Sequence, residues 1–287
     1  MVDQAADAGP ASGAAMTVRI MVGDVIDQLA LLPDESVHCV VTSPPYWRQR
    51  DYGMAGQIGL EPNPAQYATA LSEVFAAIRR VLVPTGSCWL NLADKWASGG
   101  NGGGGSLSKK RPAWRVLAGE KGWRYPPDGW KDKDLVLAAF MVAERLRQDG
   151  WFLRKTIIWA KPNAIEPCRL DRPSLSHEYV FLLSKLNNSN VRNPGKSWWH
   201  SSVWEITPAH FENHPAVMPS ELARRMILAG SEPGDTILDP FLGSGTTALV
   251  ADQLGRDCIG IEINPEYAAM ARRRIEGDAG LFAKIAS

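Results

Sequence analysis

Two short motifs near opposite ends of the chain constrain its fold more than any other feature. The later one is Leu238-Asp239-Pro240-Phe241-Leu242-Gly243-Ser244-Gly245-Thr246-Thr247, between an apolar run at 236–238 and a helical pattern over 246–254. A strand, an acidic residue and a glycine turn that opens a helix form a cradle for a nucleotide-like ligand. A second strand over 258–261 ends in Glu262, about 20 residues on, where dinucleotide folds place an acid on ribose hydroxyls. This pair of strand ends predicts a cofactor site.

The earlier motif is Thr42-Ser43-Pro44-Pro45-Tyr46, directly after an apolar run at 37–41. That run is too apolar for a half-exposed strand and predicts a central parallel one. Because ligands of open α/β sheets bind at the carboxyl ends of the strands, both motifs are expected at one edge of the sheet.

Alternating strand and helix patterns predict an α/β fold, with a mostly parallel twisted sheet and helices on both faces. Strands are expected at 18–22, 37–41, 87–92, 152–159, 179–183, 236–238 and 258–261, and helices at 25–32, 64–82, 134–148, 219–229, 246–254 and 265–276. Pro84-Thr85-Gly86 is expected to separate a helix from a strand, and strands 152–159 and 179–183 to form the far edge. Residues 1–16 are expected to be a disordered tail, with Met16 as an alternative start, before a single domain over 17–287.

Composition narrows the class of protein. The formal net charge is zero, so a partner rich in phosphates has to be met by a local basic surface. The cysteines lack C-x-x-C spacing, which argues against a zinc site or a disulfide framework and favours a cytoplasmic protein without a metal; they are Cys39, Cys88, Cys168 and Cys258. No apolar run reaches the ~18 residues of a membrane span, so no membrane contact is expected.

The order of the two motifs resembles that of the S-adenosylmethionine-dependent DNA amino-methyltransferases, and more narrowly their circularly permuted beta group. In that group the catalytic half comes first, a target-recognition region follows and the cofactor half comes last, as here from about 18 to 275. The resemblance implies a Rossmann-like methyltransferase fold with an inserted recognition region. It also implies S-adenosyl-L-methionine as cofactor, double-stranded DNA as substrate, a cognate restriction endonuclease as a further partner, and a monomer or homodimer.

The catalytic residues of such a reaction would be Ser43, Pro44, Pro45 and Tyr46. An exocyclic base amine is a poor nucleophile because its lone pair is delocalised into the ring. Two acceptors aimed at its hydrogens, the Ser43 hydroxyl and the Pro44 carbonyl, would turn the nitrogen towards tetrahedral geometry. Tyr46, or else Trp47, would stack on a base flipped out of the duplex. The alternative is a purely structural turn with a packed tyrosine.

The resemblance also implies a set of cofactor-binding residues: Asp24, Asp239, Pro240, Phe241, Gly243, Ser244, Gly245, Thr246, Glu262 and His214. Asp24 has a second interpretation as a helix N-cap, since Gly-Asp before a helix is a common cap. Asn91 and Asp94 end a strand and either line the pocket or form a turn. His214 is weak by itself, because a lone histidine is more often structural.

Two segments, 95–133 and 186–213, are expected to contact DNA. Residues 106–133 hold eight Lys or Arg against three acids, with tryptophans interleaved, a pattern that favours phosphate and base contacts; a Trp-anchored lobe packing on itself is the alternative. The predicted DNA-binding residues are Trp47, Arg48, Arg50, Lys109, Lys110, Arg111, Arg115 and Arg124. A polar stretch that includes Arg172, His177 and Glu178 matches the family without an assigned role.

The target amine is left between two choices. A serine at the first position of the tetrapeptide Ser43-Pro44-Pro45-Tyr46 resembles the cytosine-N4 enzymes, whereas adenine-N6 enzymes more often carry Asp or Asn at that position. A serine hydroxyl can nevertheless accept a hydrogen bond from either amine. Cytosine-C5 chemistry is rejected because Pro167-Cys168 lies far from a cofactor strand. Two further functions stay open: methylation of RNA or of a protein amide, and a catalytically idle DNA-binding module.

Overall fold

The structure is a computed structural model that describes residues 16–97, 131, 133–162, 172–211, 214–279 and 284–286. Its main sheet contains β1 (Thr17–Val22), β2 (Val37–Thr42), β3 (Leu82–Leu92), β4 (Phe152–Ala160), β5 (His177–Ser184), β6 (Val203–Glu205), β9 (Thr236–Asp239), β10 (Asp257–Glu262) and β11 (Lys284–Ala286). A separate hairpin consists of β7 (Ala209–Phe211) and β8 (His214–Val217). The helices are α1 (Val25–Ala30), α2 (Pro64–Val81), α4 (Ala138–Gln148), η1 (Ser197–His200), α5 (Ser220–Gly230), α6 (Thr246–Gln253) and α7 (Pro265–Ala279).

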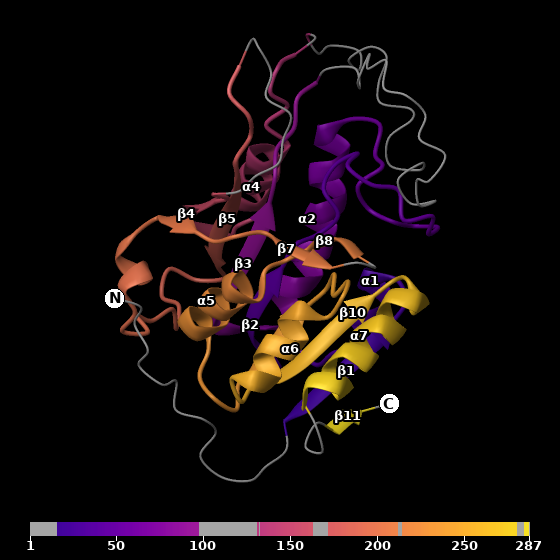
Figure 1. Cartoon of the computed structure of the whole chain (residues 1–287), viewed down its shortest axis with the longest axis vertical. Helices are drawn as coiled ribbons and strands as arrows, with labels where there is room; N and C mark the ends of the chain where they lie inside the picture. The colour runs from indigo at the N-terminus through magenta and orange to yellow at the C-terminus, as the bar shows by residue number, and fades with distance from the viewer. Residues whose placement is uncertain are drawn as a thin grey trace.

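The strand order is β11-β1-β10-β9-β2-β3-β5-β4-β6. Within this sheet β5 runs antiparallel to both of its neighbours, and every other pairing is parallel. The predicted mostly parallel sheet is therefore confirmed. β9 and β10, from the end of the chain, lie between β1 and β2 from its beginning. Figure 1 shows yellow β10 beside indigo β1. The carboxyl ends of β2 and β9 are consequently adjacent.

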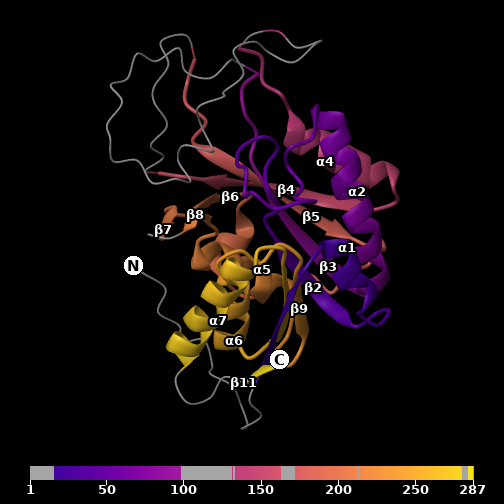
Figure 2. The ribbon, with the colours of Figure 1, turned by 90° about the vertical axis from the view of Figure 1, so that its right-hand side faces the viewer.

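Helices cover both faces of the sheet, as predicted. Figure 2 shows α5, α6 and α7 on one side and α1, α2 and α4 on the other. The apolar face of α2, which includes Leu71, Phe75 and Ile78, belongs to one core cluster together with the buried residues of α4. Residues of α5 and α6 form the second cluster with the other face of the sheet. Both faces of the central strands are thus buried, which explains their apolar runs.

Three local predictions are wrong. Pro84-Thr85-Gly86 lies inside β3, because a register shift opposite Val37 and Cys39 lets the strand begin at Leu82 directly after the helix. The helix predicted to begin at 134 is α4, which begins at Ala138, since Leu137 has a φ of +61° and Leu135 bridges to Trp96. The far edge is β6, a strand too short for periodicity to reveal.

The predicted recognition segments are described only in part. Lys109, Lys110, Arg111, Arg115 and Arg124 lie outside the described residues, as do Cys168 and residues 1–15 of the tail predicted over 1–16. Within 186–213, Trp204 is buried and stacks on Trp89 with ring centroids 6.2 Å apart, so this part of the segment belongs to the sheet edge. Over the described ranges, no helix has the length and apolarity needed to cross a bilayer.

Candidate active site

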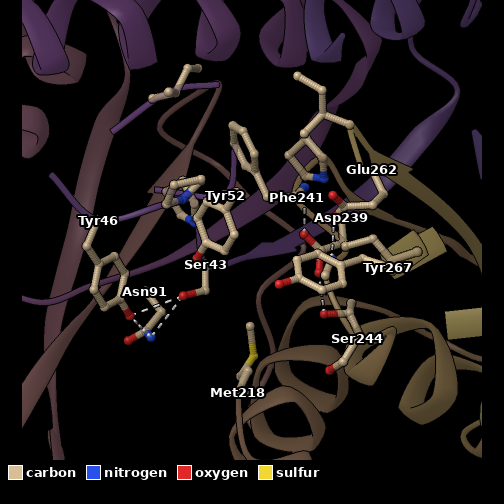
Figure 3. A pocket seen from close by; sticks show the side chains of 18 of the residues that line it. Ser43, Tyr46, Tyr52, Asn91, Met218, Asp239, Phe241, Ser244, Glu262 and Tyr267 are labelled. Carbon is tan, nitrogen blue, oxygen red and sulfur yellow. Dashed lines mark hydrogen bonds between the residues drawn. The ribbon is translucent and has the colours of Figure 1, made fainter. Parts of the chain in front are cut away.

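A cavity of about 350 Å³ lies across the carboxyl ends of the strands β1, β2, β9 and β10. Both sequence motifs line it, with Ser43, Pro44, Pro45 and Tyr46 at one end and the glycine turn after Asp239 at the other. Figure 3 shows Ser43, Tyr46 and Asn91 on one side, Asp239, Ser244 and Glu262 on the other, and Phe241 between them. The predicted meeting of the two motifs is confirmed.

Asp239 organises the glycine turn from within the protein. Its side chain is 2% exposed; Oδ1 accepts from Thr42 Oγ1 at 2.9 Å and from the Phe241 N–H at 3.1 Å, and Oδ2 accepts from Thr247 Oγ1 at 2.6 Å. Burial raises the pKa of Asp239 to about 6, although these three hydrogen bonds oppose the rise. A carboxylate with these partners holds the turn in place more than it offers itself to a ligand.

Glu262 ties the end of β10 to the same turn. The residue is 8% exposed, with carboxylate Oε2 accepting from the Gly243 N–H at 2.8 Å and Oε1 from the Asn264 N–H at 2.9 Å. Burial raises the pKa of Glu262 despite these bonds. Since each oxygen has a further lone pair and Glu262 lines the cavity, it can still accept from a ligand hydroxyl.

Arg274 of α7 holds the back of the turn, a role that local sequence does not reveal. Its Nη1 donates to Thr246 Oγ1 at 2.9 Å and to both the carbonyl and the hydroxyl of Ser244 at 3.2 Å. Gly245 has a φ of +81°, and a Cβ there would lie 2.8 Å from the Cβ of Ala271. Gly245 does not itself line the cavity, so its contribution is to let the turn pack against α7.

Asp24 fits both of its interpretations. Its Oδ1 accepts from the N–H groups of Ile26 at 2.9 Å and Asp27 at 3.4 Å, which makes it the N-cap of α1. It also lines the cavity, beside Gly23 at the end of β1. His214 lies on β8 by its backbone, and its side chain is outside the described part of the chain.

The catalytic end holds a compact group of polar side chains. Tyr46 Oη donates to Glu178 Oε2 at 2.6 Å and lies 3.1 Å from Ser43 Oγ. Asn91 Nδ2 donates to Tyr46 Oη at 2.7 Å and to Glu178 Oε2 at 2.8 Å. The ammonium group of Lys161 pairs with the other carboxylate oxygen of Glu178. We call these five side chains the serine network.

Asp94, the other strand-end residue, takes the turn-forming alternative. Its Oδ1 accepts from the backbone N–H of Lys95 at 2.8 Å and of Ala138 at 3.2 Å, so it helps to begin α4. It does not line the cavity, whereas Asn91 does. Burial raises the pKa of Asp94 against the effect of these bonds.

Trp47 does not fit its predicted role. Its side chain is 2% exposed, belongs to the core cluster around α2, and donates its indole N–H to the carbonyl of Glu61 at 3.0 Å. Contact with DNA would require the loop after β2 to open, so we leave Trp47 out of the DNA surface. Tyr46 is only partly buried and lines the cavity. It therefore stays the candidate for stacking on a base.

The two arginines after the tetrapeptide lie differently from each other. Arg50 lines the cavity near Tyr52 and Tyr267, whose rings meet edge to face with centroids 6.2 Å apart. Burial raises the pKa of Tyr52, and the guanidinium of Arg50 opposes that rise. Arg48 has a φ of +49° and donates from Nε to the carbonyl of Glu61 at 3.2 Å. Arg50 is thus placed beside the cofactor end, where it was not expected.

The residues at the glycine-turn end fit S-adenosyl-L-methionine. Glu262 and Asp24 supply carboxylates at the ends of β10 and β1, suited to ribose hydroxyls and to an adenine amine. Phe241 and Ile263 line the cavity and are suited to pack against the apolar parts of such a cofactor. Among the described residues, no group of three or more His, Cys, Asp or Glu is arranged to hold a metal ion.

Lys161 and Glu178 were not identified as site residues from the sequence. Lys161 follows β4, and Glu178 lies at the start of β5. Because these strands are antiparallel neighbours, the end of one lies beside the start of the other, and Trp159 pairs with Glu178. For Glu178 the polar stretch that matches the family was a signal without an assigned role, and for Lys161 the signal was a polar residue at a strand end, which required knowing that the strands pair.

Comparisons with known proteins point to one family. The N6/N4 methyltransferase family model, described as DNA methylase, matches residues 37–273. The Type II methyltransferase M.SmaI of Serratia marcescens is 42% identical over 90% of this chain and 90% of its own length, and M.Cfr9I of Citrobacter freundii is 40% identical over 92% and 90%. A solved structure of a candidate DNA modification methylase from Thermus thermophilus, complexed with S-adenosyl-L-methionine, superposes with a TM-score of 0.65 at 26% identity, covering 94% of this chain and 99% of that one.

Proposed function

This chain belongs to the DNA methylase family of N6 and N4 amino-methyltransferases, and we propose that it methylates the N4 amine of cytosine at a specific sequence in double-stranded DNA. The family predicted from the two motifs is confirmed, with S-adenosyl-L-methionine as its cofactor. The observation that supports the proposal most is the cavity lined by both Ser43 and the glycine turn.

The residues of this chain prepare the amine for reaction. Bound S-adenosyl-L-methionine would bring an electrophilic methyl group on a sulfonium. Ser43 Oγ and the Pro44 carbonyl accept the two amine hydrogens and hold the nitrogen lone pair towards that carbon. Pro45 is anchored from behind, since Tyr67 Oη donates to its carbonyl at 3.0 Å. The cofactor end is held by Glu262 and by the turn that Asp239 and Arg274 support.

The choice of cytosine N4 over adenine N6 rests on Ser43, because serine at this position resembles the N4 enzymes. A serine hydroxyl accepts from either amine, so adenine N6 is the second candidate. For the remaining contacts to DNA we propose Arg48, after the catalytic loop, and Arg50, which lines the cavity beside the cofactor end. The basic residues Lys109, Lys110, Arg111, Arg115 and Arg124, which lie outside the described part of the chain, complete the set.

The likeness to Type II methyltransferases supports a further proposal about the biological role of the chain. We propose that the chain protects DNA from a cognate restriction endonuclease by modifying the sequence that the endonuclease cuts. Sequencing DNA from cells that express the chain, with detection of modified bases, would identify that sequence.

The direct test uses tritiated S-adenosyl-L-methionine with unmodified genomic DNA, with total RNA and protein in parallel reactions. Label is expected in DNA, and nucleoside chromatography should give N4-methylcytosine. N6-methyladenine would instead support the second candidate. Label confined to RNA or protein, or no label in any substrate, would contradict the proposal.

A further inference from the structure

The hydroxyl of Tyr46 has only one possible direction for its hydrogen. It lies 2.6 Å from Glu178 Oε2, and an ionised carboxylate has no hydrogen to give, so the tyrosine donates. Burial raises the pKa of Tyr46 well above its ordinary value and the charge of Glu178 adds to the rise, so the phenol keeps this hydrogen. Asn91 Nδ2 supplies a second contact at 2.7 Å, in which Tyr46 accepts.

The direction of the Ser43 hydroxyl hydrogen follows from the direction of the Tyr46 hydrogen. Because Tyr46 has given its hydrogen to Glu178, the 3.1 Å contact between the two hydroxyls requires that Ser43 donates. The amide of Asn91 cannot turn over to reverse this. Its Nδ2 also donates to Glu178 Oε2 at 2.8 Å, and a turned amide would place its oxygen against the carboxylate.

Ser43 therefore faces the cavity with its lone pairs. The approach of Asn91 Nδ2 is long, at 3.4 Å, because the hydrogens of that amide are given to Tyr46 and Glu178, so the Ser43 lone pairs are left for whatever enters the cavity that Ser43 lines. A hydroxyl in this state accepts from an N–H group and repels a lone pair. This is the state in which a serine can hold an amine hydrogen.

We propose that Glu178 is a positioning residue that sets the direction of the hydrogen bonds in the serine network and so makes Ser43 an acceptor. The inference rests on the proposed function, because an acceptor at Ser43 matters only if the substrate presents an amine. Lys161 contributes to this arrangement, because its ammonium group pairs with Oε1 of Glu178 and leaves Oε2 to accept from Tyr46 and Asn91.

The substitution Glu178→Gln tests the direction of the bonds without changing the size of the side chain. An amide has one acceptor oxygen, and Lys161, which can only donate, should claim it. The amide NH₂ then faces Tyr46 Oη and Asn91 Nδ2, so no acceptor at position 178 holds the hydrogens of these two groups, and Ser43 is no longer fixed as an acceptor. We expect a loss in single-turnover methyl transfer on the order of 10- to 100-fold. Cofactor affinity and thermal midpoint should stay near those of the unsubstituted chain.

The effect of Glu178→Gln should also be measured in a chain that carries Lys161→Met. Without Lys161 the amide oxygen at position 178 is released to accept from Tyr46, so E178Q should cost several-fold less in K161M than in the unsubstituted chain. A second cycle avoids Lys161 altogether. Ser43→Ala should cost less in E178Q than alone, because it removes an acceptor that has already been lost.

Glu178→Gln with an unchanged rate, or with the same loss in both backgrounds and full additivity with S43A, would overturn the inference. A parallel fall in cofactor affinity and thermal midpoint would also overturn it, because that pattern indicates a merely structural role. If the unsubstituted chain labels neither DNA, RNA nor protein, the proposed function fails instead. The two failures are therefore distinguishable.

Discussion

Thr42 Oγ1 donates to Asp239 Oδ1 at 2.9 Å, and this buried bond joins residues 197 positions apart. Thr42 directly precedes the catalytic serine, and Asp239 begins the glycine turn. One hydrogen bond between adjacent parallel strands therefore sets the catalytic loop relative to the cofactor turn. The two motifs are far apart along the chain, and the pairing of β2 with β9 brings them together.

Thr42→Val should weaken both the fold and the site. The substitution keeps the shape of the side chain but removes one donor from a buried carboxylate, which costs about 1–3 kcal/mol of unfolding free energy. Urea denaturation followed by circular dichroism measures this loss. Thr42→Ser keeps the hydroxyl and is the matched control; equal losses in both variants would show that the hydrogen bond is not responsible.

Gly243→Val should abolish binding of S-adenosyl-L-methionine. Gly243 has a φ of +53°, which a β-branched residue adopts only with strain, and its N–H anchors Glu262. Gly234 has a φ of +86° with open space around it and lies away from the cavity. Gly234→Val should therefore lower stability and leave cofactor affinity intact, as measured by calorimetry. Similar affinities in the two variants would contradict the role given to Gly243.

Asp239→Asn should remove a pH dependence of stability. The pKa of Asp239 is raised from 3.8 to about 6 in the folded chain, so the folded state holds this proton more tightly than the unfolded state. The stabilisation is complete below pH 3.8 and is lost as the pH rises through about 6. Relative to D239N, the unsubstituted chain should lose on the order of 1–3 kcal/mol between about pH 4 and 6. A constant difference in urea unfolding free energy over that range would contradict this.

Ser43→Ala should slow methyl transfer more than it weakens cofactor binding. Ser43 lies in the serine network, at the end of the cavity away from the cofactor carboxylates. Loss of one preorganised hydrogen-bonding partner typically costs about 100-fold in kcat. Single-turnover rates and calorimetric cofactor affinity separate the two effects. Unchanged turnover would show that Ser43 is not catalytic.

Arg274→Met should loosen the glycine turn. Arg274 donates to Ser244 and to Thr246, and burial lowers the pKa of its guanidinium. Cofactor affinity is expected to fall roughly tenfold for the loss of about 1.4 kcal/mol of turn stabilisation. Arg273→Met, at an exposed position on the same helix, is the control and should bind as tightly as the unsubstituted chain. Equal affinities in the two variants would remove Arg274 from the site.

The sequence by itself determined the parts of this protein that depend on local chemistry. The apolar run over 37–41, the glycines after Asp239 and the periodicity of 64–82 each act over a few residues. They predict a central strand, a cofactor turn and an amphipathic helix wherever they occur. The position of both motifs at one end of the strands followed from these patterns, and the family followed from the resemblance of the two motifs and of their order to known amino-methyltransferases.

The tertiary structure alone decided which side chains complete the site. Glu178 meets Tyr46 from 132 positions away, and Arg274 reaches Thr246 from another helix. Trp47 is buried although it directly follows Tyr46, which is only partly buried. The partner and the burial of a side chain depend on which strands and helices become neighbours, and that is a property of the whole packed chain, which no short stretch of residues carries.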